Sequence, residues 1–565
     1  MRPARCRTSL VVLAGISITL SCIIDAGAAD GTRVQYAVST ANRYASEAGM
    51  QVLAQGGTAA DAAVAIQMVL GLVEPQSSGL GGGAIVLYRD ERDRSVHAFD
   101  GLAKSPTNYD SKSRSLSAFS HSGAAVGVPG ALRLFEVIHR KYGKLPWATL
   151  FNRALELADG GFVVSPYLAR SLASAAHAGM PVPHWFVGSD GKIVAEGALV
   201  RNTQLADQLR KIAHDGAEAF YRDSAVTLVE AVQHAKVPGT LAIEDFTKYQ
   251  AAERSPICLN LRENRLCSFP PPSYGGVTML ELLGILENID KNSGAFSSTQ
   301  FVHDFAEAGR LAEADRMLFV GDPEKGSIEV NGFLDPGYMK ARASLVKPDS
   351  SLKGRVANGL PKGISQPSCT SSEVPSLPST SQVSIVDSYG NALAMTTTIN
   401  TNFGSWIAVS GFFLNNAMTN FALPEDGSCL ANSPAGEKRP ETAMAPVIGM
   451  ELNGDPTLVG GSAGGPEIID YVAQAIVELL AGRNPSEALA EGHVSSGKAP
   501  YPDSAGLIEL EEGKPIAELA EPLASIGQNV KVVPLSSGMG FLVKRRGRWE
   551  GAADPRRDGT FSSSN

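Results

Sequence analysis

The sequence is poor in the groups that bind nucleic acids and metal ions. Its 49 lysines and arginines are outnumbered by 58 aspartates and glutamates, so the formal net charge is −9. Domains that bind a phosphate backbone usually carry clustered basic residues, and we therefore expect no nucleic acid among the partners. The nine histidines form no H-x-x-x-H motif and no Cys/His cluster at ligand spacing. We therefore expect no metal ion and no metal catalysis.

Long apolar runs are also scarce. One run follows three arginines and precedes a group of small residues, which is the layout of a secretory signal peptide: Arg2, Arg5 and Arg7, then Leu10–Ile24, then Ala26–Ala29. The run is shorter than the ~20 residues of a membrane-spanning helix. We expect residues 1–28 to be a cleaved signal peptide, the protein to be periplasmic or secreted, and no stable membrane span to remain. A short membrane anchor, or a lipid anchor at Cys22, is the alternative.

Cysteine is scarce as well, with six residues in the whole chain. Two of them belong to the predicted leader, which leaves Cys258, Cys267, Cys369 and Cys429 in the mature chain. An export compartment permits disulfides. Cys258 and Cys267 flank a predicted hairpin turn and could face each other, but the spacing leaves the pairing of the four open.

Turn signals and apolar periodicity predict a mixed α/β protein. The spacing predicts helices from Ser39 to Leu72, interrupted at Gly56–Thr58, and successive helices over 126–235. Two short strands are expected within 256–269 and a further helix over 279–289. The glycines of 79–83 lead into a predicted strand, whereas a dinucleotide-binding motif has its glycines between a strand and a helix. We expect a tight turn there and no nucleotide cofactor.

The composition changes abruptly before residue 380. Nine of the fourteen residues of 366–379 are Ser, Thr or Pro, which predicts an exposed connection. Alternation then begins, with Val383 and Ile385 on one face of a predicted half-buried strand. A turn at 387–391 and a second strand at 392–399 would place Thr380 opposite Thr398, within one residue.

A pair of threonines across two strands is an ordinary structural contact, but it can also be catalytic. A threonine hydroxyl needs a base, and an N-terminal threonine carries its own base in the α-amine. The unperturbed pKa of that amine is about 7.7–8.0. Cleavage of the chain between Ser379 and Thr380 would therefore create a nucleophile.

A second motif offers a competing interpretation. The segment Gly460–Gly464 fits G-x-S-x-G around Ser462, between a predicted strand and a predicted helix, as in a serine hydrolase. His493 is the only histidine that follows, and no strand intervenes to present an acid. The backbone N–H groups of Gly464 and Gly465, at the start of a helix, could instead hold an oxyanion.

Short motifs in a fixed order run through nearly the whole chain: GGTAADAAVA at 56–65, PQSSGLGGG at 75–83, PPPSYGG at 270–276, AEADR at 312–316 with GDP at 321–323, LNN at 414–416, KRP at 438–440 and ADPRRDG at 553–559. Together they resemble the γ-glutamyltransferase (glutathione hydrolase) family. The resemblance implies a four-layer αββα N-terminal-nucleophile sandwich made as a proenzyme. It also implies cleavage into a large subunit, 29–379, and a small subunit, 380–565, which remain associated.

The resemblance assigns roles to individual residues. Thr380 takes the position of the nucleophile, Thr398 that of the residue hydrogen-bonded to it, and Asn400 a position that contacts substrate. Gly464 and Gly465 match the glycines of the oxyanion hole. The catalytic half of the family's site is thus complete.

The positions that bind the glutamyl group depart from the family's pattern. Leu102 stands where the family has its carboxylate-binding arginine, and Ala417 and Asn420 stand where it has the Gln and Asp that hold the α-amine. The family's serine pair becomes Thr442 and Ala443. A bidentate Arg–carboxylate contact is among the strongest hydrogen-bonded pairs, so its loss predicts a change in specificity.

We expect a threonine amide hydrolase or acyltransferase that passes an acyl-enzyme to water or an amine, with a small amide as substrate. Glutathione-like γ-glutamyl amides are the family's default substrates. Lys104 could supply a cation near Leu102, but without the fork of a guanidinium. Two alternatives stay open: an acylase of the same family acting on a non-glutamyl amide, and a catalytically degenerate binding protein.

Overall fold

The computed structural model describes residues 35–112, 119–289, 296–317, 319–326, 330–354, 356–362, 379–422, 431–496 and 506–564. The chain divides into Met1–Arg33 and a compact unit, Val34–Asn565, to which all the elements named below belong. The predicted signal peptide, Cys369, Cys429 and the Ser/Thr/Pro-rich segment up to residue 378 lie outside the described residues. Within the described residues, no helix combines the length and the apolar character that crossing a membrane requires.

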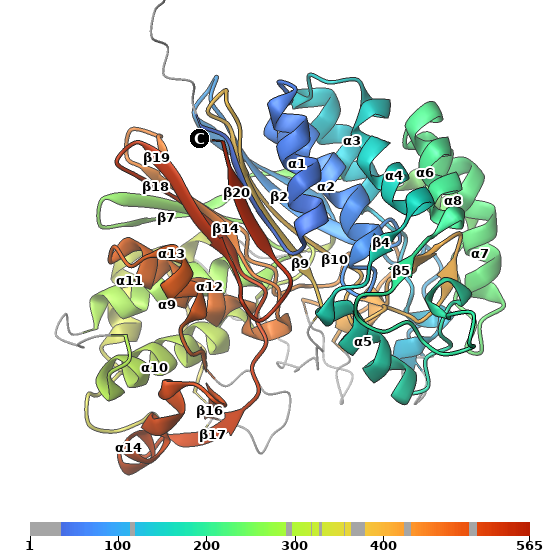
Figure 1. The fold of residues 1–565 in the computed structure, drawn as a ribbon. Helices are drawn as coiled ribbons and strands as arrows, with labels where there is room; N and C mark the ends of the chain where they lie inside the picture. The colour runs from blue at the N-terminus through green and yellow to red at the C-terminus, as the bar shows by residue number, and fades with distance from the viewer. Residues whose placement is uncertain are drawn as a thin grey trace, which may run out of the picture. The chain divides into compact units, whose positions relative to one another are not determined.

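The fold is mixed α/β and is built around two antiparallel sheets (Figure 1). Within the described residues the first sheet has seven strands, in the order β20 (Thr560–Ser563), β1 (Ala37–Thr40), β9 (Ser381–Val386), β10 (Ala392–Thr398), β2 (Gly83–Asp90), β3 (Ser95–Gly101) and β6 (Ala252–Arg254). The second has six, in the order β19 (Arg548–Ala553), β18 (Gly540–Arg545), β14 (Pro456–Gly461), β13 (Val447–Glu451), β8 (Asn264–Ser268) and β7 (Ile257–Leu261). Smaller sheets pair β11 (Ala408–Val409) with β12 (Phe412–Phe413), β4 (Phe162–Val163) with β5 (Leu199–Val200), and β16 (Leu507–Glu511) with both β15 (Val494–Ser495) and β17 (Asn529–Val533).

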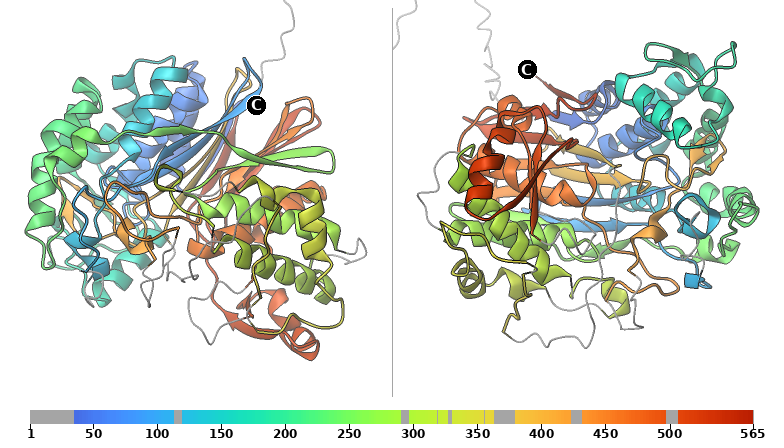
Figure 2. Two further views of the ribbon diagram at one scale, coloured as in Figure 1. Left: turned by 180° about the vertical axis from the view of Figure 1, so that it is seen from behind. Right: turned by 90° about the horizontal axis from the view of Figure 1, so that it is seen from below.

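The helices form two groups, one beside each sheet (Figures 1 and 2). The group beside the first sheet comprises α1 (Arg43–Ala54), α2 (Ala59–Val73), α3 (Ala131–Tyr142), α4 (Asn152–Gly160), α5 (Pro166–His177), α6 (Thr203–Asp215), α7 (Ala225–Gln233) and α8 (Ile243–Lys248). The group beside the second comprises α9 (Tyr274–Asn288), α10 (Thr299–Arg316), α11 (Pro336–Ala343), α12 (Ile468–Leu480), α13 (Pro485–Ala490) and α14 (Ala520–Ser525).

Both faces of the central strands of the first sheet are buried. In β10, Leu393 and Met395 pack with the core that includes α1, α2 and α3. Ala392 and Ala394, which point the other way because successive side chains in a strand alternate, pack with the core that includes the second sheet, α9 and α12. Strands β9 and β10 contact β14 of the second sheet directly.

The β9–β10 hairpin has the register that its turn predicts. Val386 pairs with Ala392 and Ser381 with Thr397, so the same register continues to Thr380 and Thr398. The prediction that β9 is half-buried is wrong, because all six of its residues are buried. The second sheet covers the polar face, where Ser384 Oγ donates to the carbonyl oxygen of Gly540 at 2.8 Å.

The predicted helices are found with shifted ends. The break at Gly56–Thr58 is confirmed: α1 ends before it, and the Thr58 hydroxyl accepts a hydrogen bond from the N–H of Asp61 at 3.3 Å as the N-cap of α2. The predicted helical start at Ser39 is wrong, since Ala37–Thr40 is strand β1. That segment pairs with β9 and β20, both distant in sequence, and this pairing overrides the local periodicity.

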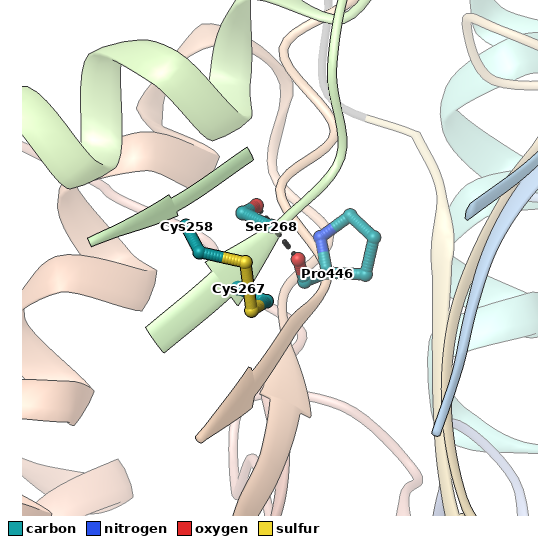
Figure 3. Close-up of a disulfide and its surroundings, with 4 residues drawn as sticks. All are labelled: Cys258, Cys267, Ser268 and Pro446. Carbon is teal, nitrogen blue, oxygen red and sulfur yellow. Dashed lines mark hydrogen bonds between the residues drawn. A yellow bond between two sulfur atoms is a disulfide. The ribbon is translucent and has the colours of Figure 1, made fainter. Parts of the chain in front are cut away.

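Cys258 and Cys267 form a disulfide between β7 and β8 (Figure 3). They are directly paired residues of this hairpin, with their Cα atoms 4.1 Å apart. The suggestion that they could face each other is therefore confirmed. Beside them, Ser268 Oγ donates to the carbonyl oxygen of Pro446 at 2.8 Å, which joins β8 to the start of β13.

Candidate functional site

Thr380 lies immediately before β9, opposite the last residue of β10. Its side-chain oxygen Oγ1 lies 3.3 Å from Oγ1 of Thr398. The structure therefore brings together the two threonines that the hairpin pattern predicts as partners. Both Thr380, 3% exposed, and Ser379, 1% exposed, are buried, so the predicted exposed connection does not extend to Ser379.

The peptide bond between Ser379 and Thr380 is surrounded by hydroxyl groups. The Thr380 hydroxyl hydrogen-bonds to the carbonyl oxygen of Ser379. Thr398 Oγ1 donates to the same oxygen at 3.1 Å and accepts from the N–H of Asn400 at 2.8 Å. The Ser379 carbonyl group thus has a candidate nucleophile, the Thr380 hydroxyl, beside it and a second hydroxyl bound to its oxygen.

A glycine-rich turn packs directly against the main chain of Thr398. A Cβ atom on Gly82 would lie 2.2 Å from the carbonyl oxygen of Thr398, and one on Gly81 would lie 2.1 Å from that of Phe413. Only glycine permits such a close approach of backbones. The segment 79–83 is therefore a tight turn that leads into β2, as the sequence predicts.

Asn400 follows β10 in a left-handed conformation, with φ = 85°. Its Nδ2 donates to the carbonyl oxygen of Asn416 at 3.2 Å and to Thr419 Oγ1 at 2.7 Å. These bonds fix the side chain, which lines the pocket beside Thr398.

Two charged residues that contact the start of the hairpin are not predicted by the sequence patterns. Arg557 Nη1 donates to the carbonyl oxygen of Thr380 at 2.8 Å and so fixes the main chain of the candidate nucleophile. Glu74 accepts from the Ser381 hydroxyl at 3.1 Å, and burial raises the pKa of Glu74 to about 8 against the opposing charge of Arg557. Arg557 lies in the ADPRRDG motif, which marks it for attention but does not reveal its contact.

The two predicted oxyanion glycines lie at the end of the loop that follows β14. Gly464 has φ = 138° and Gly465 has φ = 71°, and Gly465 begins the short 3₁₀ turn Gly465–Glu467 that precedes α12. Gly465 lines the same pocket as Thr380. Gly464 is not among the described lining residues, and its role as an oxyanion donor stays a prediction.

The serine-hydrolase interpretation of Ser462 finds no support in the geometry. Ser462 is fully buried, and its hydroxyl donates to the carbonyl oxygen of Ala463 at 2.7 Å. The ring of His493 contacts Ser537 at 2.7 Å and Gln474 at 3.3 Å instead. Burial holds the pKa of His493 well below its usual range. In the described part of the chain, Ser462 has neither a contact with a base nor a place in the pocket.

A pocket of about 430 Å³ opens beside Thr380. It is lined by Tyr274, Ser379, Thr380, Thr398, Asn400, Asn420, Glu441, Thr442, Ala443, Met444, Gly465 and Ile468. A second pocket, of about 320 Å³, shares five of these residues and is also lined by Gly83, Leu102, Ala103, Ile399, Asn415, Ala417 and Pro440. The structure thus gathers every predicted site residue except Gly464 around two adjoining spaces.

Glu441 is a lining residue that the sequence analysis does not single out. It is 7% exposed, and its Oε1 accepts from Arg316 Nη1 at 3.1 Å. Burial raises the pKa of Glu441 to about 7, while the charge of Arg316 opposes the rise. The sequence places Glu441 next to Thr442 in the RPET segment, but it does not reveal the contact with Arg316, which is distant in the sequence.

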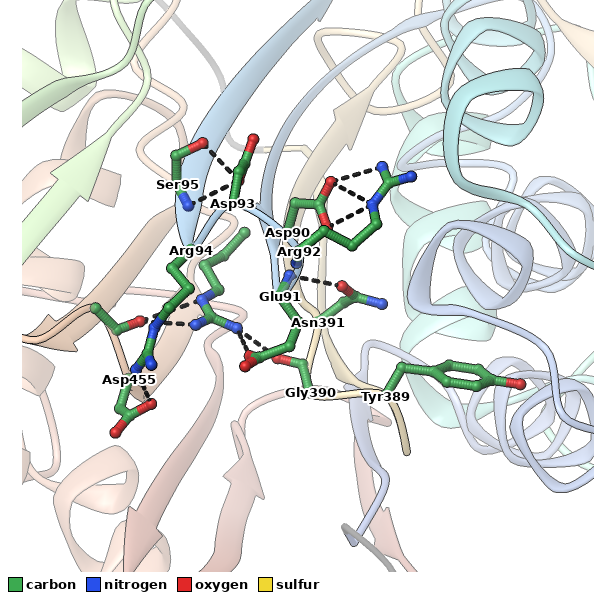
Figure 4. Close-up of polar contacts among 12 residues, drawn as sticks. Asp90, Glu91, Arg92, Asp93, Arg94, Ser95, Tyr389, Gly390, Asn391 and Asp455 are labelled. Atoms are coloured by element: carbon green, nitrogen blue, oxygen red, sulfur yellow. Dashed lines mark hydrogen bonds and ion pairs between the residues drawn. The ribbon is translucent and has the colours of Figure 1, made fainter.

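A group of possible metal ligands lies at the β2–β3 turn, at the other end of β2 from the pocket. The side chains of Asp90, Asp93 and His97 bring one ligand atom each within 4.8 Å of one another at the β2–β3 turn. Arg92 pairs with Asp90 at 2.6 Å, and the Ser95 hydroxyl donates to Asp93 at 2.7 Å (Figure 4). These ion pairs and hydrogen bonds give the carboxylates of Asp90 and Asp93 a structural role in the turn.

Comparisons with known proteins identify the same family as the sequence motifs. Residues 45–564 match the family described as Gamma-glutamyltranspeptidase. The chain is 31% identical to the Glutathione hydrolase proenzyme of Escherichia coli (strain K12), covering 92% of this chain and 90% of that protein. It is 32% identical to the Acylase ACY 1 proenzyme of Pseudomonas sp. (strain SE83), covering 93% of this chain and 92% of that protein. The solved cephalosporin acylase from Bacillus halodurans has the same fold, with a TM-score of 0.79 at 23% identity over 94% of this chain and 96% of that one.

Proposed function

Because the chain belongs to the gamma-glutamyltranspeptidase family, we propose that it is a self-processing amide hydrolase or acyltransferase with Thr380 as its nucleophile. The observation that carries this proposal is the hydroxyl pair of Thr380 and Thr398, 3.3 Å apart, at the wall of a pocket and beside the Ser379–Thr380 peptide bond. The two packed sheets and their helices would then form the αββα sandwich of the N-terminal-nucleophile hydrolases.

Self-cleavage would begin at the Thr380 hydroxyl. Its oxygen would attack the carbonyl carbon of Ser379, and the peptide C–N bond would break as the hydroxyl proton passes to the nitrogen of Thr380. Ser379 would then be joined to the Thr380 oxygen as an ester, and water would hydrolyse that ester to the Ser379 carboxylate and the free Thr380 hydroxyl. Ser379 would end the large subunit, 29–379, and the free α-amine of Thr380 would begin the small subunit, 380–565. The contact of Thr398 with the Ser379 oxygen would stabilise the negative charge that develops there.

The mature site would use the same hydroxyl on a substrate amide. The α-amine of Thr380 takes the hydroxyl proton, and Oγ1 attacks the amide carbonyl carbon. The N–H groups of Gly464 and Gly465 would hold the oxyanion. The leaving amine departs with the proton, and the acyl-enzyme passes its acyl group to water or to a second amine.

The acyl group is the open part of the proposal. The family name favours a γ-glutamyl amide such as glutathione, and one of the relatives is a glutathione hydrolase proenzyme. Another relative is an acylase proenzyme. Leu102, Ala417 and Asn420 line the pocket at the positions where the family would bind the glutamyl group. They favour an acylase that acts on an amide other than γ-glutamyl.

We also propose that the protein is exported, either to the periplasm or outside the cell. The layout of residues 1–28 supports this, as does the Cys258–Cys267 disulfide, since such bonds persist in oxidising compartments.

The test is to purify the protein, run it on a denaturing gel, sequence the N-terminus of the smaller band, and assay a panel of acyl 4-nitroanilides. We expect two bands, a small chain that begins at Thr380, and turnover of at least one anilide. Thr380→Ala should leave one band and no turnover, because it removes the nucleophile of both reactions. The control Ser462→Ala should still be cut.

Two other results would contradict the proposal. An uncut wild-type chain without amidase activity would favour a degenerate binding protein. Loss of turnover in Ser462→Ala, with Thr380→Ala active, would favour a serine hydrolase.

A further inference from the structure

One wall of the second pocket is apolar. Its apolar lining residues are Leu102, Ala103, Ile399, Ala417 and Pro440. Thr398 and Asn400 line this pocket and also the pocket of Thr380, so the two spaces adjoin at the candidate nucleophile. A substrate whose carbonyl carbon lies beside Thr380 Oγ1 can therefore extend its acyl chain along the apolar wall.

The main chain of Leu102 is fixed on both sides. Its N–H donates to Asp100 Oδ1 at 3.0 Å, and its carbonyl oxygen accepts from the Tyr249 hydroxyl at 2.7 Å. Both polar groups of Leu102 are thus used within the protein, which leaves its aliphatic side chain for contact with a ligand.

The side-chain amides of this pocket are largely occupied by protein groups. Asn415 makes four hydrogen bonds to main-chain groups, at 2.7–3.0 Å, and Asn400 Nδ2 donates to two acceptors. Asn420 Nδ2 donates to the carbonyl oxygen of Glu441 at 3.1 Å, and Asn420 Oδ1 is buried without a partner in the described residues. That oxygen is an acceptor, so it would repel a carboxylate.

The cations beside this wall are held in ion pairs with carboxylates. Lys104 Nζ lies 3.3 Å from Glu324 Oε2. Arg439 pairs with Glu324 at 2.8 Å and with Asp100 at 3.4 Å, and Arg254 pairs with Asp100 at 2.7 Å. No lysine or arginine is among the described lining residues of either pocket. A cation of this network would leave a carboxylate unpaired if it turned to a substrate, which is costly.

Glu441, a charged residue that lines both pockets, is also paired. Its Oε1 accepts from Arg316 Nη1 at 3.1 Å. Burial lowers the pKa of Lys438, and the negative charges of Asp322 and Glu441 oppose the fall. Lys438 Nζ donates to two main-chain carbonyl oxygens, at 2.6 and 2.8 Å. These charged groups thus have partners within the protein, and the apolar wall is the surface left for an acyl chain.

We propose that the acyl group of the substrate is an uncharged aliphatic chain seated against Leu102, Ala103 and Ala417, with Leu102 as the specificity-determining residue. This inference rests on the proposed function, because it takes the pockets beside Thr380 to be the acyl site. Each methylene group that leaves water for an apolar wall favours binding. A carboxylate at the end of the chain would lose its hydration without gaining a cationic partner among the described residues.

The experiment uses the self-cleaved protein and acyl 4-nitroanilides with unsubstituted chains, from acetyl to pentanoyl. The glutaryl and 5-aminopentanoyl anilides have the same chain length as pentanoyl but a charged end, and the γ-glutamyl anilide carries both charges. We expect kcat/KM to rise about fourfold for each added methylene, the factor that corresponds to its burial. Pentanoyl should exceed both singly charged chains of equal length by about tenfold or more.

Variants assign this preference to the apolar wall. Leu102→Asn replaces two methyl groups by an amide of similar shape, so we expect the gain per methylene to fall toward a factor of one. Leu102→Met is an apolar exchange of similar volume and should keep most of the gain. Lys104→Gln removes a nearby cation and should leave every ratio as in the wild type.

Melting temperatures and complete self-cleavage confirm that each variant folds. Because Leu102 is buried, a second variant tests the same wall with less effect on folding. Ala417→Ser makes a half-buried position polar, and it should also reduce the gain per methylene.

The outcomes separate this inference from the proposed function. A chain that cleaves itself but prefers the glutaryl, 5-aminopentanoyl or γ-glutamyl anilide to pentanoyl overturns the inference alone. The same holds if kcat/KM does not rise with chain length, or if the rise survives both Leu102→Asn and Ala417→Ser. A glutaryl preference that is lost in Lys104→Gln would identify Lys104 as the specificity residue instead. A chain that neither cleaves itself nor hydrolyses any anilide overturns the proposed function, and with it this inference.

Discussion

At the scale of single residues, the hydroxyl of Thr398 has two contacts that bear on catalysis. It lies 3.3 Å from the Thr380 hydroxyl, and it donates to the Ser379 carbonyl oxygen at 3.1 Å. The first contact would position the Thr380 hydroxyl as the proposed nucleophile. The second polarises the bond that self-cleavage would break. A valine at this position keeps nearly the same volume and removes both contacts.

We therefore expect Thr398→Val to slow the conversion of the precursor to two chains by roughly a hundredfold to a thousandfold, as for other lost hydrogen-bond donors at a reacting carbonyl. The measurement is the time course of the precursor band on a denaturing gel. The matched control is Thr397→Val. That neighbour is also buried in β10, but its hydroxyl contacts only the carbonyl oxygen of Gly83, at 3.4 Å, in the described structure. Equal effects of the two changes would contradict the assigned role.

At the scale of secondary-structure elements, the approach of the glycine turn to β10 places Thr398. We expect Gly82→Ala to force β2 and β10 apart, because its Cβ would lie 2.2 Å from the Thr398 carbonyl oxygen. Overpacking of this kind typically costs about 1–3 kcal/mol, so the melting temperature should fall by several degrees and self-cleavage should slow.

The control for this prediction is Gly160→Ala at the end of α4, where an added Cβ would meet no atom within 4 Å. We expect this variant to melt at or slightly above the wild-type temperature, since alanine favours the helix more than glycine does. Differential scanning calorimetry compares the two changes. A Gly82→Ala protein that melts and processes normally would show that the close approach is dispensable.

The same elements show what the sequence could predict. The register of β9 against β10 follows from a five-residue turn and a two-residue period, both local, and this was enough to bring Thr380 to Thr398. The burial of the polar face of β9 could not be predicted in this way. It depends on β14 and β18, which come later in the chain and have no local signal for where they pack.

At the scale of the whole molecule, the site residues that could not be predicted have partners that are distant in the sequence. Arg557 contacts Thr380 across 177 positions of the chain, and Arg316 contacts Glu441 across 125. Each residue alone resembles an ordinary charged side chain. Only the assembled fold shows that Arg557 fixes the main chain of Thr380 and that Arg316 pairs with a carboxylate that lines the pocket.

The fold also determines what cleavage before Thr380 would do to the molecule. Strand β1 of the predicted large subunit lies between β9 and β20 of the predicted small subunit, and β10 pairs along its length with β2. In the second sheet, β13 pairs with β8. Both sheets are thus shared between the two chains, and their separation would break backbone hydrogen bonds and expose both buried cores.

We therefore expect the cleaved chains to elute together from a size-exclusion column as one species of about 59 kDa, less the mass of any leader removed, or as a multiple of it. Dilution and high salt should leave the complex intact, because apolar burial and sheet pairing do not depend on screened charges. The chains should part only at denaturant concentrations that also abolish the circular dichroism signal of the fold. Dissociation of a folded small chain under native conditions would contradict the interleaved sheets.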